Sequence, residues 1–84
     1  MEEEVKSGIE RFKAECEKRL PTIKLVIPIR PTGGAFLVSF THNGVRTSGT
    51  IHEDDFADWG EGTNIDAMVS VVKDSVNKLM NSES

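Results

Sequence analysis

The residues that could carry nucleophilic or acid–base chemistry in this chain are one cysteine and two histidines. Cys16 falls on an apolar stripe with Phe12 and Leu20, where a free cysteine is typically a small buried hydrophobic side chain and not a nucleophile. His42 lies next to Asn43-Gly44, which is predicted below to be a hairpin turn, and His52 ends the strand that follows the turn. The strand pairing that such a turn sets places the two histidines on opposite faces of the hairpin. They cannot form a dyad, so we expect no enzymatic activity.

No set of residues has the spacing of a metal or cofactor site. An EF-hand loop needs alternating oxygen ligands and a glycine at its sixth position, and the sixth position counted from Asp54 is Trp59. Gly60-Glu61-Gly62 precedes a predicted helix as phosphate-binding loops do. Glu61 and Asp66 would repel a phosphate there, and no P-loop lysine follows. We therefore expect neither a cofactor nor a metal.

Carboxylates gather between residues 53 and 66, a stretch without lysine or arginine. Acidic residues at a helix start are favoured by the helix dipole, and this structural role accounts for about half of the group. The others would present a negative patch to a basic partner. We call the candidate binding residues the acidic segment, which comprises Glu53, Asp54, Asp55, Asp58 and Glu61.

Asn43-Gly44, between two apolar-rich runs, predicts a two-residue hairpin turn, because both residues tolerate positive φ. The turn would place Phe40 opposite Thr47 and Phe36 opposite Ile51. Alternation of Ile23, Leu25, Ile27 and Ile29 predicts a preceding strand. With Pro31–Gly34 as a four-residue loop, the expected pairs are Leu25 with Phe40, Ile27 with Val38 and Ile29 with Phe36. Both hairpins then direct the same face to the core.

Helices are predicted on both sides of these strands. The first helix has a stripe at helical spacing and ends before Pro21; the stripe is Val5, Ile9, Phe12, Cys16 and Leu20. A short helix over His52–Trp59 would direct Phe56 and Trp59 to the core. Thr63 and Asp66 have the spacing of a capping box for a final helix. The buried face of that helix is predicted to be Ile65, Met68, Val69, Val72, Val76, Leu79 and Met80.

These elements predict one α+β domain over residues 1–84. The expected order is helix, three strands, short helix and long helix, with two helices packed on one face of a three-stranded antiparallel meander of strand order 1-2-3. Residues 1–4 and 81–84 are expected to fray.

The outer side of the sheet, which we call the open face, combines basic, hydroxyl and apolar residues. Its candidate binding residues are Lys24, Arg30, Arg46, His52, Leu37 and Val26. Ser39, Thr41, Ser48 and Thr50 lie between them, with Pro28 and Ala35 toward the apolar end. A basic patch attracts an anionic partner, whereas positive residues on an edge strand also deter sheet aggregation. An outer apolar cluster on so small a domain also favours a homodimer.

Charge and cysteine usage indicate a compartment. The formal net charge is −4, the single cysteine excludes an internal disulfide, and no apolar stretch approaches a membrane span. The start Glu2-Glu3-Glu4 is opposite in charge to a signal peptide. We expect a cytoplasmic protein that does not contact membranes.

The predicted order of helix, three antiparallel strands and helix resembles that of double-stranded RNA-binding domains over nearly the whole chain. In that family a lysine-rich cluster begins the last helix, whereas residues 63–68 here contain no basic residue. The order and acidity are also similar to those of several small phage-encoded inhibitors, including some anti-CRISPR proteins.

The sequence thus predicts a small non-enzymatic protein-interaction module, such as a regulator, inhibitor or accessory subunit. It would bind a protein partner through the open face or the acidic segment, and would form a homodimer through the open face. The alternative hypothesis is nucleic-acid binding through the basic residues of the open face, although the net negative charge disfavours it.

Overall fold

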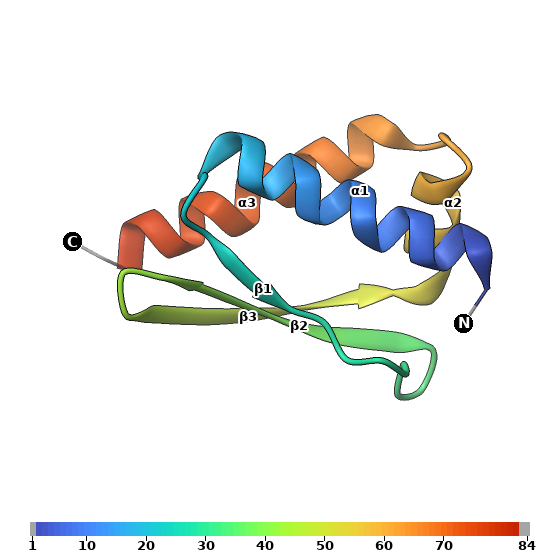
Figure 1. Ribbon diagram of the computed structural model, residues 1–84, viewed down its shortest axis with the longest axis horizontal. Coiled ribbons are helices and arrows are strands. Elements are labelled where there is room, and N and C mark those ends of the chain that lie inside the picture. The colour runs from blue at the N-terminus through green and yellow to red at the C-terminus, as the bar shows by residue number, and fades with distance from the viewer. Residues whose placement is uncertain (1, 83–84) are drawn as a thin grey trace.

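The computed structural model describes residues 2–82 and has helices and strands in the predicted order (Figure 1). The elements are α1 (Glu3–Arg19), β1 (Lys24–Val26), β2 (Ala35–His42), β3 (Val45–His52), α2 (Glu53–Gly60) and α3 (Ile65–Ser82). The strands form one antiparallel sheet of order β1-β2-β3. The helices lie on one side of the sheet and leave the other side uncovered (Figure 1), which confirms the predicted α+β fold. Residues 1, 83 and 84, part of the ends expected to fray, lie outside the described residues.

The hairpin of β2 and β3 forms in the predicted register. Asn43 and Gly44 have φ values of 50° and 79°, and the pair that closes the turn is His42 with Val45. Phe40 is opposite Thr47 and Phe36 opposite Ile51, as expected from a two-residue turn. The Asn-Gly signal therefore sets which side chains of both strands face the helices.

The first strand is shorter than predicted. Leu25 pairs with Phe40 as expected, but the ladder ends where Val26 meets Ser39. Gly33 and Gly34, with φ values of 59° and 78°, make a two-residue turn that sets Thr32 opposite Ala35.

This turn leaves five residues between Val26 and Thr32 facing three between Ala35 and Ser39. The segment 27–31 cannot stay in register with β2, so the predicted pairs of Ile27 with Val38 and Ile29 with Phe36 are wrong. Ile29 is 84% exposed instead of buried.

The predicted apolar faces of α1 and α2 are buried. In α1, Val5, Phe12 and Cys16 are buried and the helix ends at Arg19, ahead of Pro21. In α2, Phe56 and Trp59 are buried. All five aromatic residues of the chain join one cluster, in which the ring centroids of contacting pairs are 5.4 to 6.2 Å apart, and Phe12 contacts the rings of Phe40, Phe56 and Trp59.

The last helix differs from its prediction at both ends. Met68, Val72 and Leu79 are buried as expected, whereas Met80 is 46% exposed. The capping box at Thr63 does not form, because the Thr63 hydroxyl donates to the Asp58 carbonyl oxygen at 2.8 Å. Thr63 therefore closes the end of α2 and does not open α3.

The helices α1 and α2 touch through their backbones at two glycines. A Cβ atom at Gly8 would lie 1.8 Å from the Phe56 carbonyl oxygen, and one at Gly60 would lie 1.8 Å from the Glu4 carbonyl oxygen. Both distances are far inside van der Waals contact, and the obstacles are backbone atoms. Only glycine fits at either position.

We predict that Gly8→Ala and Gly60→Ala each destabilise the fold by about 3 kcal/mol or more, since the helices must separate to admit a methyl group. Alanine in an exposed helix interior would instead stabilise by about 1 kcal/mol relative to glycine, so the sign of the effect identifies the contact. Urea unfolding measures it. Gly49→Ala is the matched control, because its Cβ meets only Phe40 Cε2 at 3.9 Å. Equal stability of all three variants would contradict the close contact.

A second prediction concerns Thr47, whose side-chain oxygen is buried and has no hydrogen-bond partner among residues 2–82. Thr47→Val replaces the hydroxyl with a methyl group of similar size and removes an uncompensated polar atom. We expect the free energy of unfolding to rise by about 1 kcal/mol. A loss of stability in the same urea titration would show that the hydroxyl is satisfied in solution.

Candidate functional site

The open face carries a basic row at the end nearest the Asn43-Gly44 turn. Lys24 is opposite Thr41 on β2, and Thr41 is opposite Arg46 on β3, so the three side chains lie across the sheet in one line. Lys24 and Arg46 are exposed. Arg46 Nη2 donates to Ser39 Oγ at 3.3 Å, which orients the guanidinium along the face toward β2.

Beside this row the open face is apolar. Val26 is opposite Ser39, and Leu37 is two residues from Ser39 on the same face, so Val26 and Leu37 are diagonal neighbours. Their side chains are 65% and 60% exposed. Two large aliphatic side chains are thus adjacent on an uncovered sheet.

The remaining predicted residues of this surface separate. His52 is exposed at the far end of β3, opposite Ala35. Arg30 is exposed but follows β1 in the segment that has left the ladder, so no strand positions it. Five of the six predicted residues therefore lie on strands with the outward side chains expected of them, and Arg30 does not.

The acidic segment is divided along α2. Glu53, Asp54 and Asp55 form its first turn, where they favour the positive end of the helix dipole. Asp58 is only partly exposed and is engaged within the fold, because its Oδ2 accepts from Asn64 Nδ2 at 2.9 Å. Glu61 follows the helix and is exposed. The Asp58 carboxylate is therefore partly engaged in a contact within the fold, whereas Asp54, Asp55 and Glu61 are exposed.

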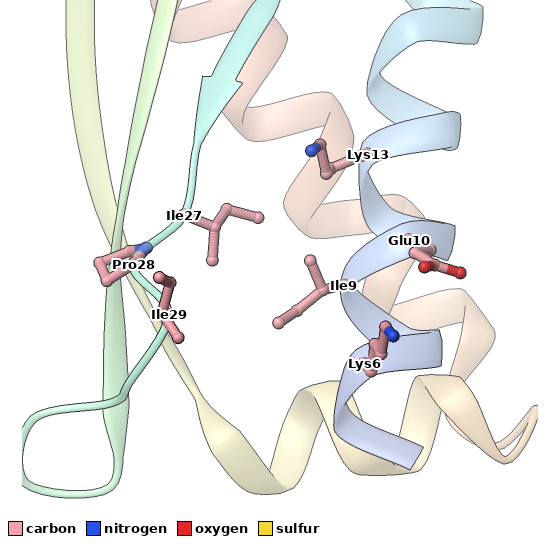
Figure 2. Close-up of a pocket in the computed structure, with 7 residues that line it drawn as sticks. All are labelled: Lys6, Ile9, Glu10, Lys13, Ile27, Pro28 and Ile29. Carbon is pink, nitrogen blue, oxygen red and sulfur yellow. The ribbon is translucent and has the colours of Figure 1, made fainter. Parts of the chain in front are cut away.

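A groove that the sequence reasoning missed lies between α1 and the segment that leaves the sheet (Figure 2). Its volume is about 480 Å³, and it is lined by Lys6, Ile9, Glu10, Lys13, Ile27, Pro28 and Ile29. Ile27 and Ile9 point toward each other across it, and Lys6, Glu10 and Lys13 project from the same stretch of α1 (Figure 2). The signal in the sequence was the spacing of residues 6, 9, 10 and 13, which is one face of a helix.

The candidate catalytic groups are placed as the sequence predicts. His42 is 7% exposed, and its Nε2 lies 2.6 Å from Thr22 Oγ1 in a hydrogen bond, whereas His52 is on the open face. Cys16 is fully buried, and burial, with a smaller effect of Glu15 and Glu17, raises the pKa of its thiol to about 12. Within residues 2–82, no group of three or more histidine, cysteine and acidic residues is placed to hold a metal ion. None of the helices in that range has the length and apolar content needed to cross a bilayer.

Comparison with protein families, with curated proteins and with solved structures finds no match to this chain.

The thiol of Cys16 supplies a third prediction. Because its pKa is about 12 in the fold against an ordinary value of 9.0, both states are protonated below pH 9, and above it the unfolded state loses its proton first. The stability contributed by the protonated thiol is therefore full below pH 9 and is lost as the pH rises toward 12, at up to about 1.4 kcal/mol per pH unit.

Urea titrations at pH 8, 9 and 10 measure this dependence of stability on pH. Cys16→Ala lacks the thiol but keeps the lysines, which titrate in the same pH range, so the difference between the two proteins gives the contribution of the thiol. Iodoacetamide at pH 8 should label the thiol only in urea. Rapid labelling of the folded protein would contradict the buried position.

Proposed function

We propose that this protein is a small, non-enzymatic, cytoplasmic protein-interaction module that docks through its open face. The observation that carries the proposal is the adjacent pair Val26 and Leu37, each more than half exposed on the side of the sheet that no helix covers. Exposed apolar clusters on small domains are typical of interaction surfaces. A regulator, inhibitor or accessory subunit needs such a surface and no catalytic group.

The chemistry of the face indicates the partner. Val26 and Leu37 form an apolar centre, and Lys24 and Arg46 form a basic margin on one side of it. A protein surface with an apolar patch bordered by carboxylates would complement both parts, because rim charges direct orientation while buried apolar contacts supply affinity.

A second copy of the chain meets these requirements. The basic row lies near the Asn43-Gly44 turn, and Glu53, Asp54 and Asp55 follow β3 at the opposite end of the sheet. A twofold axis that lies between two open faces and runs across the strands would set the basic end of each copy against the acidic end of the other. The open face is therefore also proposed as a homodimer interface.

The partner hypothesis predicts that Val26→Ser/Leu37→Ser loses binding without loss of fold. The immobilised chain would be used to capture protein from a lysate of its source organism, and the native chain, the double variant and Met80→Ser would be compared. Met80 is the matched control, since it is an exposed apolar residue on α3. We expect at least about tenfold less captured protein for the double variant, as for loss of a central apolar anchor. Equal capture by all three chains would refute docking through this face.

The homodimer hypothesis is tested separately by sedimentation velocity across a range of concentration. A dimer that dissociates in Val26→Ser/Leu37→Ser but persists in Met80→Ser is expected, and added salt should weaken it because the ends carry opposite charges. A native chain that stays monomeric at about 1 mM would exclude this interface, since that concentration corresponds to only about 4 kcal/mol of association free energy.

The row of Lys24, Thr41 and Arg46 also supports the second candidate, a nucleic-acid backbone as the anionic partner. All five aromatic side chains are at most 2% exposed, so none is available to stack on unpaired bases, and a duplex is the form to test. Binding of duplex RNA that falls steeply with salt and disappears in Lys24→Glu/Arg46→Glu would favour nucleic acid over protein. Absence of binding at low salt would remove this candidate.

A further inference from the structure

The groove beside α1 begins where the outer edge strand of the sheet ends. β1 is an edge strand, and residues 27–29, which follow it, form one wall of the groove while α1 forms the other (Figure 2). An apolar channel between an edge strand and a helix is the setting in which extended peptides add to a sheet. This surface is distinct from the open face, which lies on the broad side of the strands.

The backbone of this edge has groups available for pairing. The hairpin turn makes His42 and Val45 a hydrogen-bonded pair, so the backbone groups of His42 point toward β3. Successive residues of β2 point their backbone groups to opposite neighbours, so those of Thr41 and Ser39 point toward β1. The N–H and C=O of Leu25 must therefore point away from β2. Within residues 2–82, no backbone hydrogen bond joins residues 25–31 to any element other than β2.

Pro28 does not block this edge. The ladder with β2 ends at Val26, so the N–H that proline lacks is not needed there. The outer side keeps the donor and the acceptor of Leu25. Shortening of β1 therefore removes pairing with β2 but not the outward backbone groups of Leu25.

The side chains around the groove define a complementary ligand. Ile9, Ile27 and Ile29 supply aliphatic contact, and Ile29 is 84% exposed. Lys6 and Lys13 lie along one side with Glu10 between them, which leaves a net positive charge. The two lysines are seven residues apart on a helix, or about 10 Å.

We propose that this groove binds an extended acidic peptide of a partner protein, added as a strand to the outer edge of β1, with the pattern acidic-x-aliphatic-x-acidic. In a strand, residues i−2, i and i+2 share a face, and the outer two are about 13 Å apart. The central aliphatic side chain contacts the isoleucines, and the flanking carboxylates reach Lys6 and Lys13 through the flexible lysine side chains. Backbone bonds to the N–H and C=O of Leu25 hold the peptide in register.

Charge disfavours a second copy of this strand as the occupant. Lys24 begins β1 and Arg30 follows it, so pairing β1 with another β1 would gather like charges beside Lys6 and Lys13. An acidic strand turns the same charges into attraction. The positive edge thus selects against self-pairing and for an anionic partner strand.

The test uses acetylated and amidated peptides of the form Glu-Thr-Ile-Thr-Glu, with valine, leucine or phenylalanine also at the centre, titrated into the full chain and followed by the amide NMR signals. We expect a dissociation constant on the order of 1 mM or lower for at least one centre, as for a short peptide that must be ordered on binding. Signals of Leu25, Ile27 and Ile29 should shift most. No binding up to about 10 mM by any of these peptides overturns the proposal.

Two controls separate strand addition from charge attraction. N-methylation of the peptide backbone should abolish binding at alternate residues only, since alternate N–H groups face the edge strand. Lys6→Glu/Lys13→Glu should weaken binding at least about tenfold, while Lys18→Glu/Lys73→Glu, which makes the same change in net charge at exposed residues outside the groove, should not.

Ile29→Thr should also weaken binding, and because this side chain is 84% exposed the change leaves the core intact. Equal weakening by both lysine pairs, or equal effects of N-methylation at every position, would overturn the proposal in favour of diffuse charge attraction. Leu37→Ser, which changes the open face on β2 and not the edge strand, should bind the peptides normally, so failure of this groove and failure of the open face can be told apart.

Discussion

The structure depends on the backbone contact between α1 and α2 at Gly8 and Gly60. Each glycine faces a carbonyl group of the opposite helix, so the two helices approach more closely than side chains would permit. At that separation Phe12 of α1 stacks on Trp59 of α2 with ring centroids 5.7 Å apart and an interplanar angle of 15°. Phe12 also meets the edge of Phe40 on β2, so the same contact joins the helix pair to the central strand. In a small domain with one core, loss of this approach would displace the whole aromatic cluster.

The helix pair also determines which surfaces remain available. Because α1, α2 and α3 all lie on one side of the sheet, the side that bears Lys24, Val26, Leu37 and Arg46 has no covering element (Figure 1). The position of α1 above the sheet edge leaves the groove between Ile9 and the segment after β1. Both proposed surfaces follow from a helix arrangement that is asymmetric about the sheet.

Much of the fold was predictable because its signals are local. Asn43-Gly44 sets a register through backbone conformation alone, and the stripe of α1 and the alternation of β2 report burial directly. The same reasoning found five of the six open-face residues. It failed at Ile29, because a four-residue loop and a two-residue Gly33-Gly34 turn are both compatible with Pro31–Gly34, and the choice between them decides whether Ile29 is in the ladder.

The groove could not be predicted for the same reason, since it exists only where that strand leaves the sheet. The close contact at Gly8 and Gly60 was missed for a different reason. A glycine within an amphipathic helix signals a close approach, but it does not say which backbone approaches. Thr63 was assigned to the wrong helix because a hydroxyl near a helix start can serve either the following N–H groups or a preceding carbonyl, and here it serves Asp58.

The exposed apolar side chains gather on the β1 side of the molecule, where both proposed surfaces lie. Among the described residues the large exposed apolar side chains are Val26, Ile29, Leu37 and Met80, and the first three lie within twelve residues of sequence on or beside the first two strands. A polar residue at any of these three positions would cost little stability, because each side chain is at least 60% exposed. Their packing within the fold gives little reason for them to lie together, whereas the proposed partners of the open face and the groove would cover them. Val26 and Lys24 are on β1, Leu37 is on β2 and Arg46 is on β3, so apolar and basic side chains lie on the same side of the sheet. One side of this domain can therefore supply both the affinity and the orientation of the proposed binding.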